Sequence, residues 1–332
     1  MNKTIRRAKK LIAEAKSIVV ICHIAPDGDT IGSALGLGWL LRRMGKHVSV
    51  VCADPIPSRY RFLPGAGEIL PHHPEGCDLI IVVDTSDTER IGALYDMAVF
   101  ATVPVINIDH HITNTHFGDV NLVEDISSTA EIIYDLANEL DVPLDINSAT
   151  GLLTGLVTDT QCFRTPNVTA DTLRRAVAMM EAGASLRDIT ELVYNRLPAS
   201  AIYLWGQALV NAQRRGRILY TTIDNETLHR YDASADELSG IVNFLASTSD
   251  ADVAVLFRER NDGRIEAGMR ASRGWKVSDV ALRLGGGGHP QAAGCILKGS
   301  LDEVREIVLS ALEQSLSEQA EEKRARPSPC ET

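Results

Sequence analysis

Short apolar segments alternate with longer periodic segments through the first half of the chain. Four apolar segments predict buried β-strands: SIVVIC (17–22), HVSVVC (47–52), DLIIVVD (78–84) and VPVINID (103–109). Helical periodicity marks four further segments: 31–45, 128–140, 147–158 and 169–182. Strands that are apolar throughout and separated by helices predict a parallel α/β sheet with helices on both faces.

The second half has a different pattern. Residues 184–213 are helical in character, with a break at Pro198 and no strand pattern. Three strands are then predicted, the last two joined by a turn at Asp262–Gly263: 217–223, 251–260 and 264–272. Helices are expected near 234–246 and 276–284, and a glycine run at 285–294 leads into a strand and a last helix ending near residue 316.

The organisation that follows is a larger parallel α/β domain, a helical connector and a smaller mixed-sheet α/β domain. We expect these parts at residues 1–185, 186–214 and 215–316, in that order. Residues 317–332, SEQAEEKRARPSPCET, are charged and contain two prolines, so a disordered tail is expected there.

Composition narrows the class of partner. The 332 residues carry a formal net charge of -11, which disfavours the broad basic surface that long duplex nucleic acid requires. Only 5% of residues are aromatic, so an extended groove that stacks single-stranded bases is not expected. A short nucleotide held by a few local cations remains compatible with this composition.

Cysteine usage and hydropathy indicate the compartment. The six cysteines are scattered and form no C-x-x-C pair, so neither a disulfide framework nor a cysteine zinc site is expected. The N-terminal segment MNKTIRRAKKLIAEAK is a basic amphipathic helix without a signal-peptide core, and no apolar segment reaches membrane-spanning length. A cytoplasmic protein without membrane association is expected.

Carboxylate and imidazole side chains follow several predicted elements at the point where each ends. They are His23, Asp27 and Asp29 in HIAPDGDTIGS, Asp84 in VVDTSD, Asp109, His110 and His111 in DHH, and Asp159 in TGLVTDT. Any single aspartate of this kind is more often a helix cap or a turn residue than a ligand. Because ligands bind outside the carboxyl ends of parallel strands, the combination is more informative than each member.

The combination predicts a metal site. Oxygen ligands with some imidazole nitrogen and no thiol suit Mn²⁺ or Mg²⁺ better than structural Zn²⁺. So many carboxylates at one sheet edge would repel one another without bound cations, which favours a centre of two metal ions. The other histidine pair, His72–His73, lies in a Pro/Gly loop before a strand and is interpreted as surface.

The glycine run GGGGHPQAAG (285–294) is a second signal. We expect its glycines to serve close backbone approach to an anion rather than packing, with His289 and Gln291 as side-chain donors. Arg270 ends the preceding strand and is suited to a bidentate phosphate contact. The alternatives are a flexible hinge for the glycines and a solvated strand end for Arg270.

Together these motifs resemble the DHH phosphoesterase superfamily. HIAPDGDTIGS, VVDTSD, DHH and TGLVTDT are similar to its four N-terminal motifs, and GGGGHPQAAG to the signature of the DHH-associated C-terminal domain. The resemblance covers residues 5 to 316 with the motifs in the family's order. Length and two-domain layout are most similar to the NrnA-type subfamily of nano-RNases that also act as pAp phosphatases.

The resemblance implies a role for each matching residue. One Mn²⁺ would be held by His23, Asp27 and Asp84, and a second by Asp29, Asp84, His110 and Asp159. His111 and Asp109 would lie just outside the ions and, with Asp84, take part in catalysis. Substrate would be held by Arg270, Gly286, Gly287, Gly288 and His289, with Ser128 lining the cleft, although a helix cap alone explains Ser128.

The activity implied is hydrolysis of very short oligoribonucleotides to mononucleotides, removal of the 3'-phosphate of pAp, or both. The main alternative is a phosphodiesterase acting on linear pApA, and a RecJ-like exonuclease or a non-catalytic nucleotide-binding module is less favoured. Mg²⁺ or Co²⁺ are alternatives to Mn²⁺, and the chain would be a monomer or a homodimer. One departure is Gln161, where the family often has glycine, so the sequence leaves the substrate geometry near Phe163 and Arg164 open.

Overall fold

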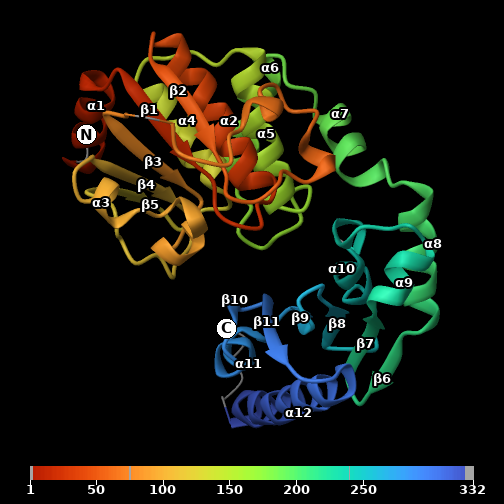
Figure 1. The fold of residues 1–332 in the computed structure, drawn as a ribbon. Coiled ribbons are helices and arrows are strands. Elements are labelled where there is room, and N and C mark those ends of the chain that lie inside the picture. The colour runs from red at the N-terminus through yellow and green to blue at the C-terminus, as the bar shows by residue number, and fades with distance from the viewer. Residues whose placement is uncertain (1–2, 75, 239, 326–332) are drawn as a thin grey trace, which may run out of the picture. The chain divides into compact units, whose positions relative to one another are not determined.

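The structure is a computed structural model that describes residues 3–74, 76–238 and 240–325. The chain divides into two compact units, Met1–Arg196 and Leu197–Thr332, here called the N-terminal and C-terminal units. Figure 1 shows the course of the chain through each of them.

A five-stranded parallel sheet forms the centre of the N-terminal unit, in the strand order β2-β1-β3-β4-β5. The strands are β1 (Ser17–Ile21), β2 (His47–Val51), β3 (Leu79–Val83), β4 (Val105–Asp109) and β5 (Val120–Val123). The parallel sheet predicted from the apolar segments is confirmed. Strand β5 was not predicted, because VNLV is short and only alternate residues are buried.

Alternate residues of the strands supply two cores, one on each face of this sheet. Val20 packs in the core with the long helices, whereas Val19 packs in the core on the opposite face. The helices of the unit are α1 (Lys3–Glu14), α2 (Gly28–Arg43), α4 (Thr129–Glu139), α5 (Ile146–Asp159), α6 (Ala170–Glu181) and α7 (Leu186–Thr190). The second face is covered by short elements, among them η3 (Thr88–Leu94) and α3 (Met97–Phe100).

Helices α2 and α5 approach each other through glycine. A Cβ atom built on Gly32 would lie 2.4 Å from the carbonyl oxygen of Gly151, and one on Gly151 would lie 2.8 Å from the carbonyl oxygen of Gly32. No larger residue fits at this crossing without moving a helix. The close approach places Asp29, in the first turn of α2, near Asp159, in the last turn of α5.

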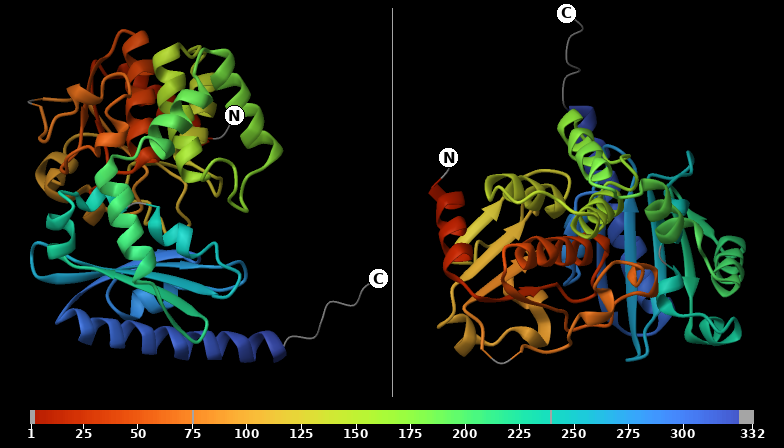
Figure 2. Two further views of the ribbon diagram at one scale, coloured as in Figure 1. Left: turned by 90° about the vertical axis from the view of Figure 1, so that its right-hand side faces the viewer. Right: turned by 90° about the horizontal axis from the view of Figure 1, so that it is seen from above.

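The C-terminal unit is built on a six-stranded mixed sheet in the order β10-β11-β9-β8-β7-β6, in which only β7 and β8 are parallel. Its strands are β6 (Gln213–Arg215), β7 (Ile218–Ile223), β8 (Val253–Glu259), β9 (Arg264–Ala271), β10 (Gly287–His289) and β11 (Ala292–Lys298). Its helices are α8 (Ala199–Val210), α9 (Asn225–Arg230), η5 (Ala235–Leu238), α10 (Ile241–Leu245), α11 (Ser278–Arg283) and α12 (Leu301–Ala325). Figure 2 shows the long helix α12 along one face of this sheet.

Two expectations about element boundaries need correction. A disordered tail from residue 317 is wrong for 317–325, because α12 continues to Ala325. Its last turns are held by Gln319, whose Oε1 accepts from the Lys276 backbone, and by Lys323, whose Nζ lies 3.2 Å from the Trp275 ring centroid. Residues 326–332 lie outside the described residues.

The predicted connector, residues 186–214, is also more varied than expected. It comprises α7, a π-helical turn (Glu191–Asn195), helix α8 and most of strand β6. Among the helices of the described residues, none combines the length and the apolar character needed to cross a membrane.

Candidate metal centre

The first motif forms a turn between β1 and α2. His23 is buried, and its Nδ1–H donates to the carbonyl oxygen of Ile24 at 2.7 Å, so Nε2 is the ring atom that faces Asp27 and Asp84. Asp27 caps α2 by accepting from two backbone N–H groups of its first turn. Ala25 adopts a left-handed conformation with φ 50°, held by the 2.6 Å hydrogen bond from its N–H to Asp54 Oδ2.

Asp84 lies between two imidazoles. Its Oδ2 is 3.4 Å from His23 Nε2, and its Oδ1 is 3.5 Å from His110 Nε2. The residue follows β3 and has φ 56°, a conformation that costs most residues energy but that aspartate tolerates better than most. The turn at the strand end therefore directs the two oxygens of one buried carboxylate to different partners.

His110 and Asp159 complete the cluster on the other side of Asp84. His110 Nε2 lies 3.4 Å from Asp159 Oδ2, while its Nδ1–H donates to the carbonyl oxygen of Ile126 at 3.2 Å. As with His23, the backbone carbonyl fixes the ring orientation and leaves Nε2 as the ring atom for a ligand-type role.

Asp29 is held by the N-terminus of α4. The backbone N–H of Thr129 donates to Asp29 Oδ2 at 2.7 Å, and that of Ala130 donates to Oδ1 at 3.2 Å. Ser33, one turn along α2, donates its hydroxyl to Oδ1 at 3.0 Å. Thr129 also donates its hydroxyl to Asp84 Oδ1 at 3.1 Å, so α4 contacts two carboxylates of the cluster.

The DHH segment orients its last histidine through its aspartate. His111 Nδ1–H donates to Asp109 Oδ1 at 2.7 Å, and Asn114 Nδ2 donates to Asp109 Oδ2 at 2.5 Å. Burial alone would raise the pKa of Asp109, but these hydrogen bonds and the histidine charge hold it below its usual value. Asp109 is thus a buried ionised acceptor, and His111 Nδ1 lies 3.7 Å from Asp84 Oδ1.

The ionisation of the cluster shows an excess of negative charge. Burial, followed by the charges of Asp84 and Asp159, raises the pKa of Asp29 well above its usual value. Burial and the charges of Asp84 and Asp27 raise the pKa of Asp159 to about 7, although His110 opposes this. Burial lowers the pKa of His23, but Asp27 and Asp84 outweigh it and raise the pKa to about 10.

These observations fit bound divalent cations. The donor set is carboxylate and imidazole without thiol, and ligand-type atoms lie within 4.8 Å of one another in three groups: His23, Asp27 and Asp84; Asp29, His110 and Asp159; Asp84, His110 and His111. Ligands about 2.1 Å from one ion are roughly 3.0–3.5 Å apart at ordinary angles, close to the contacts seen here. The cluster is a candidate centre for two metal ions.

The predicted substrate residues of the second half lie together in the C-terminal unit, but the expectation about the glycine run is partly wrong. The run forms an edge strand, β10, paired with β11. A Cβ on Gly286 would lie 2.1 Å from the Gly294 carbonyl oxygen, and one on Gly288, whose φ is 135°, would lie 2.5 Å from the Ala292 carbonyl oxygen. Gly286 and Gly288 are therefore required for packing, whereas Gly287 is under neither constraint.

Gly287 belongs to a row of three glycines. It pairs with Gly294 on β11, which pairs with Gly268 on β9, so the three lie side by side on one face of the sheet. A Cβ on Gly268 or Gly287 would have no atom within 4 Å. Glycine in a strand interior often marks close approach of a ligand or another backbone.

The neighbouring row on the same face carries Arg270 and His289, which both pair with Ala292. Arg270 Nε donates to Asn243 Oδ1 at 2.7 Å, and Nη1 donates to the Met269 carbonyl oxygen at 3.0 Å. Burial lowers the pKa of Arg270, and among the described residues no carboxylate forms an ion pair with it. The guanidinium is fixed in place by two neutral acceptors.

Ser128 is the N-cap of α4 and accepts from the Glu131 backbone N–H, so its capping role is present in the structure. Several residues that shape the centre gave no signal in the sequence. They are Asp54, Asn114 and Arg175. Only the SSTAE segment, with its cap followed by glutamate, offered a hint, because such a pattern marks a helix start.

The turn after Asp159 is strained. Gln161, Cys162 and Phe163 have φ values of 49°, 60° and 61°, three left-handed residues in succession. Each costs about 1–2 kcal/mol in such a conformation. We expect Gln161→Gly to raise the free energy of unfolding by up to about 1 kcal/mol, because relief of strain exceeds glycine's entropy cost.

Urea unfolding of the metal-free protein measures this effect. The matched variant is Gln161→Val, whose β-branched side chain tolerates the left-handed region least and should lower the free energy of unfolding by about 1 kcal/mol. A shift of both variants in the same direction would contradict strain at this position.

The fold and the cluster together define an α/β protein with a candidate two-metal centre, and comparison with known proteins identifies its class. Residues 17–156 match the DHH family, N-terminal domain, and residues 215–318 match the DHHA1 domain. The chain belongs to the DHH family.

Individual relatives refine the comparison. A protein of Thermus thermophilus named bifunctional oligoribonuclease and PAP phosphatase NrnA is 37% identical, with 93% of each chain covered. A cyclic-di-AMP phosphodiesterase, GdpP, of Geobacillus thermodenitrificans is 24% identical, and only 48% of its length is covered. A crystal structure of an exopolyphosphatase-related protein from Bacteroides fragilis has a TM-score of 0.90 at 25% identity, covering 96% of this chain and all of that one.

Proposed function

We propose that this chain is a metal-dependent phosphoesterase that cleaves very short oligoribonucleotides to mononucleotides and removes the 3'-phosphate of pAp. The observation that carries the proposal is the presence of all six ligand-type residues in one cluster of a chain similar over 93% of its length to an oligoribonuclease and PAP phosphatase. The six are His23, Asp27, Asp29, Asp84, His110 and Asp159.

The metal ions would be Mn²⁺, held by His23, Asp27 and Asp84 on one side and by Asp29, Asp84, His110 and Asp159 on the other. When bound, such a pair lowers the pKa of water and neutralises charge on phosphoryl oxygens. The two oxygens of Asp84, each turned toward a different imidazole, support its role as the shared ligand.

Residues outside the ligand set handle protons. Asp109 accepts from Nδ1–H of His111 and orients the ring. His111 would then bind the phosphate or donate a proton from Nε2 to the leaving oxygen of the substrate. Asn114 holds the Asp109 carboxylate through the oxygen that His111 does not use.

The C-terminal unit would bind the nucleotide. Arg270 and His289 would provide donors for a terminal phosphate. The adjacent row is formed by Gly268, Gly294 and Gly287 and is a surface without side chains, here called the floor, on which the flat face of a base would lie. Binding of one terminal phosphate and one base would favour very short substrates over long chains.

Alanine substitutions separate packing from binding in the glycine row. We expect Gly287→Ala to leave the fold intact and to raise KM for a dinucleotide about 10-fold, because its methyl group would project into the open space above the floor. Gly286→Ala should instead lower the free energy of unfolding by about 2–3 kcal/mol, since its Cβ meets the Gly294 carbonyl oxygen.

Steady-state kinetics on the dinucleotide and on bis(p-nitrophenyl) phosphate, with thermal unfolding, measure both effects. The generic diester has no base, so Gly287→Ala should leave its hydrolysis unchanged. Equal losses on both substrates would count against base binding at this floor.

The proposed activity is tested by turnover of pAp, pApA, an RNA pentamer and an RNA 24-mer side by side with Mn²⁺. The expected result is turnover of pAp and of the pentamer, with the 24-mer the slowest. Turnover of pApA alone would instead favour a phosphodiesterase of dinucleotides. The relative of that kind, GdpP, is less similar to this chain than the oligoribonuclease and PAP phosphatase is. Rapid processive degradation of the 24-mer, or no metal-dependent turnover, would refute the proposal.

A further inference from the structure

Glu131, on helix α4, is a fully buried carboxylate that the proposed chemistry does not use. It occupies the third position of α4, after the N-cap Ser128, and its side chain has no exposed surface. A glutamate at this position commonly accepts from the N-cap backbone N–H. Here it reaches one residue further back: Oε1 accepts from the Ser127 backbone N–H at 3.1 Å and from the Ser127 hydroxyl.

The other oxygen of Glu131 is held by Arg175 on α6. Arg175 Nη1 donates to Glu131 Oε2 at 3.0 Å, while Nε and Nη2 donate to the two oxygens of Asp135 at 3.1 and 2.6 Å. One guanidinium therefore grips two carboxylates spaced one turn apart on α4. This contact fixes both the rotation and the axial position of α4 relative to α6.

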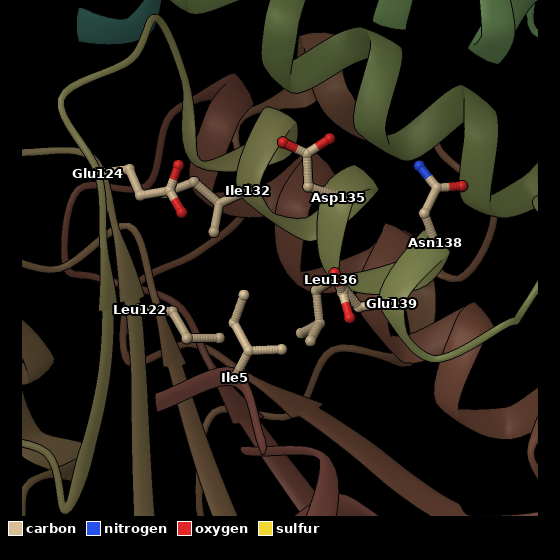
Figure 3. A pocket seen from close by; sticks show the side chains of 8 residues that line it. All are labelled: Ile5, Leu122, Glu124, Ile132, Asp135, Leu136, Asn138 and Glu139. Carbon is tan, nitrogen blue, oxygen red and sulfur yellow. The ribbon is translucent and has the colours of Figure 1, made fainter. Parts of the chain in front are cut away.

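The two carboxylates differ in their surroundings. Asp135 lines a cavity of about 420 Å³ beside α1 and β5 (Figure 3). None of the predicted site residues lines this cavity. The side chain of Asp135 is 43% exposed. Water therefore screens its ion pair. Glu131 has no such access, so its pair with Arg175 is the contact whose loss leaves a buried charge without its cation.

The N-terminus of α4 contacts two carboxylates of the metal-ligand cluster. Its first two backbone N–H groups donate to the two oxygens of Asp29, and the Thr129 hydroxyl donates to Asp84. A shift of α4 by a few tenths of an ångström would change both contacts together. The segment from Ser127 to Ala130 thus connects the Arg175–Glu131 pair to two carboxylates of the candidate centre.

We propose that Arg175 and Glu131 are positioning residues that hold the N-terminus of α4 so that Asp29 and Asp84 keep the orientation required for metal binding. The inference rests on the proposed metal centre and assigns a role to residues that touch neither metal nor substrate. Groups that orient metal ligands typically change metal affinity or activity by about 10–100-fold when removed.

The test uses the full chain, freed of metal by a chelator, and titrates Mn²⁺ by calorimetry. Glu131→Gln keeps an oxygen for Ser127 but places an amide N–H against the guanidinium, so the pair is lost at nearly unchanged volume. Arg175→Lys keeps one charged contact and loses the fork, and is expected to have a smaller effect. The control is Arg174→Lys, on the same helix, whose partner Asp171 and own side chain are both at least 70% exposed.

We expect Glu131→Gln to weaken Mn²⁺ binding about 10–100-fold and to lower kcat at fixed Mn²⁺, with KM for the dinucleotide within twofold of wild type. Arg174→Lys should match wild type in all three. Thermal unfolding of the metal-free proteins monitors stability separately, and Arg175→Lys carries the test if Glu131→Gln does not fold.

Unchanged Mn²⁺ affinity in the folded variants, whatever their melting temperature, would overturn the inference and leave the pair a purely structural contact. Failure of the wild-type protein to bind Mn²⁺ is a distinct result, because it would refute the proposed metal centre itself.

Discussion

Replacing Asp84 by asparagine is expected to lower kcat for a short oligoribonucleotide at least about 10³-fold, more than loss of one stabilising donor usually costs. Asparagine has nearly the shape of aspartate and also tolerates the left-handed backbone found at this position. The change therefore removes charge without the strain that alanine would add. The effect should be large because both oxygens of Asp84 face imidazoles of the cluster.

Metal binding provides the second readout for Asp84→Asn. We expect Mn²⁺ to raise the melting temperature of the wild-type protein, because a ligand that binds only the folded state stabilises it. Most of this shift should disappear in Asp84→Asn, since one substitution would weaken both ion sites.

The matched control is Asp145→Asn. Asp145 caps the other end of the helix that carries Asp159, and asparagine caps helices as well as aspartate does. It should retain wild-type turnover and the full metal-induced shift. If Asp84→Asn kept the shift and lost only activity, Asp84 would be a catalytic group beside the ions rather than their shared ligand.

The positions of the cluster were predictable because they depend on topology. Once the apolar segments indicated a parallel sheet, the residues following β1, β3 and β4 had to lie at one edge, whatever the details of packing. The sequence therefore placed His23, Asp84 and His110 at one edge without any side-chain geometry, and the structure brings the three side chains together. Asp159 required more, since it lies on a helix and reaches the edge only through the contact of α5 with α2.

Details that depend on packing between distant segments could not be predicted. Arg175 follows Glu131 by 44 residues, and no local pattern shows that they meet in the buried interior. The sequence around Asp84 resembles any other strand end and does not indicate the left-handed backbone conformation found there. The interpretation of the glycine run as no more than an anion site failed for the same reason. Side chains at Gly286 and Gly288 are excluded by the backbone of β11, which comes later in the chain.

The contact between α2 and α5 is the feature on which the closeness of Asp29 and Asp159 depends, and Gly32→Ala tests it. The new Cβ would lie 2.4 Å from the Gly151 carbonyl oxygen and 2.8 Å from the Gly155 nitrogen, both backbone atoms that move only with the helix. We expect the free energy of unfolding to fall by about 2–3 kcal/mol, even after alanine's advantage of about 1 kcal/mol in helix propensity.

Urea unfolding of the metal-free protein measures this loss, and Gly38→Ala is the comparison within the same helix. A Cβ at Gly38 would meet methyl groups of Val50 at 3.3 Å and of Val48 at 3.8 Å, and these side chains are able to give way. Gly38→Ala should therefore be neutral or stabilising. Because separation of α2 from α5 also moves Asp29 away from Asp159, Gly32→Ala should weaken Mn²⁺ binding while Gly38→Ala does not. Equal stability of the two variants would mean that the helices part without cost, and glycine would then not be what brings the two carboxylates together.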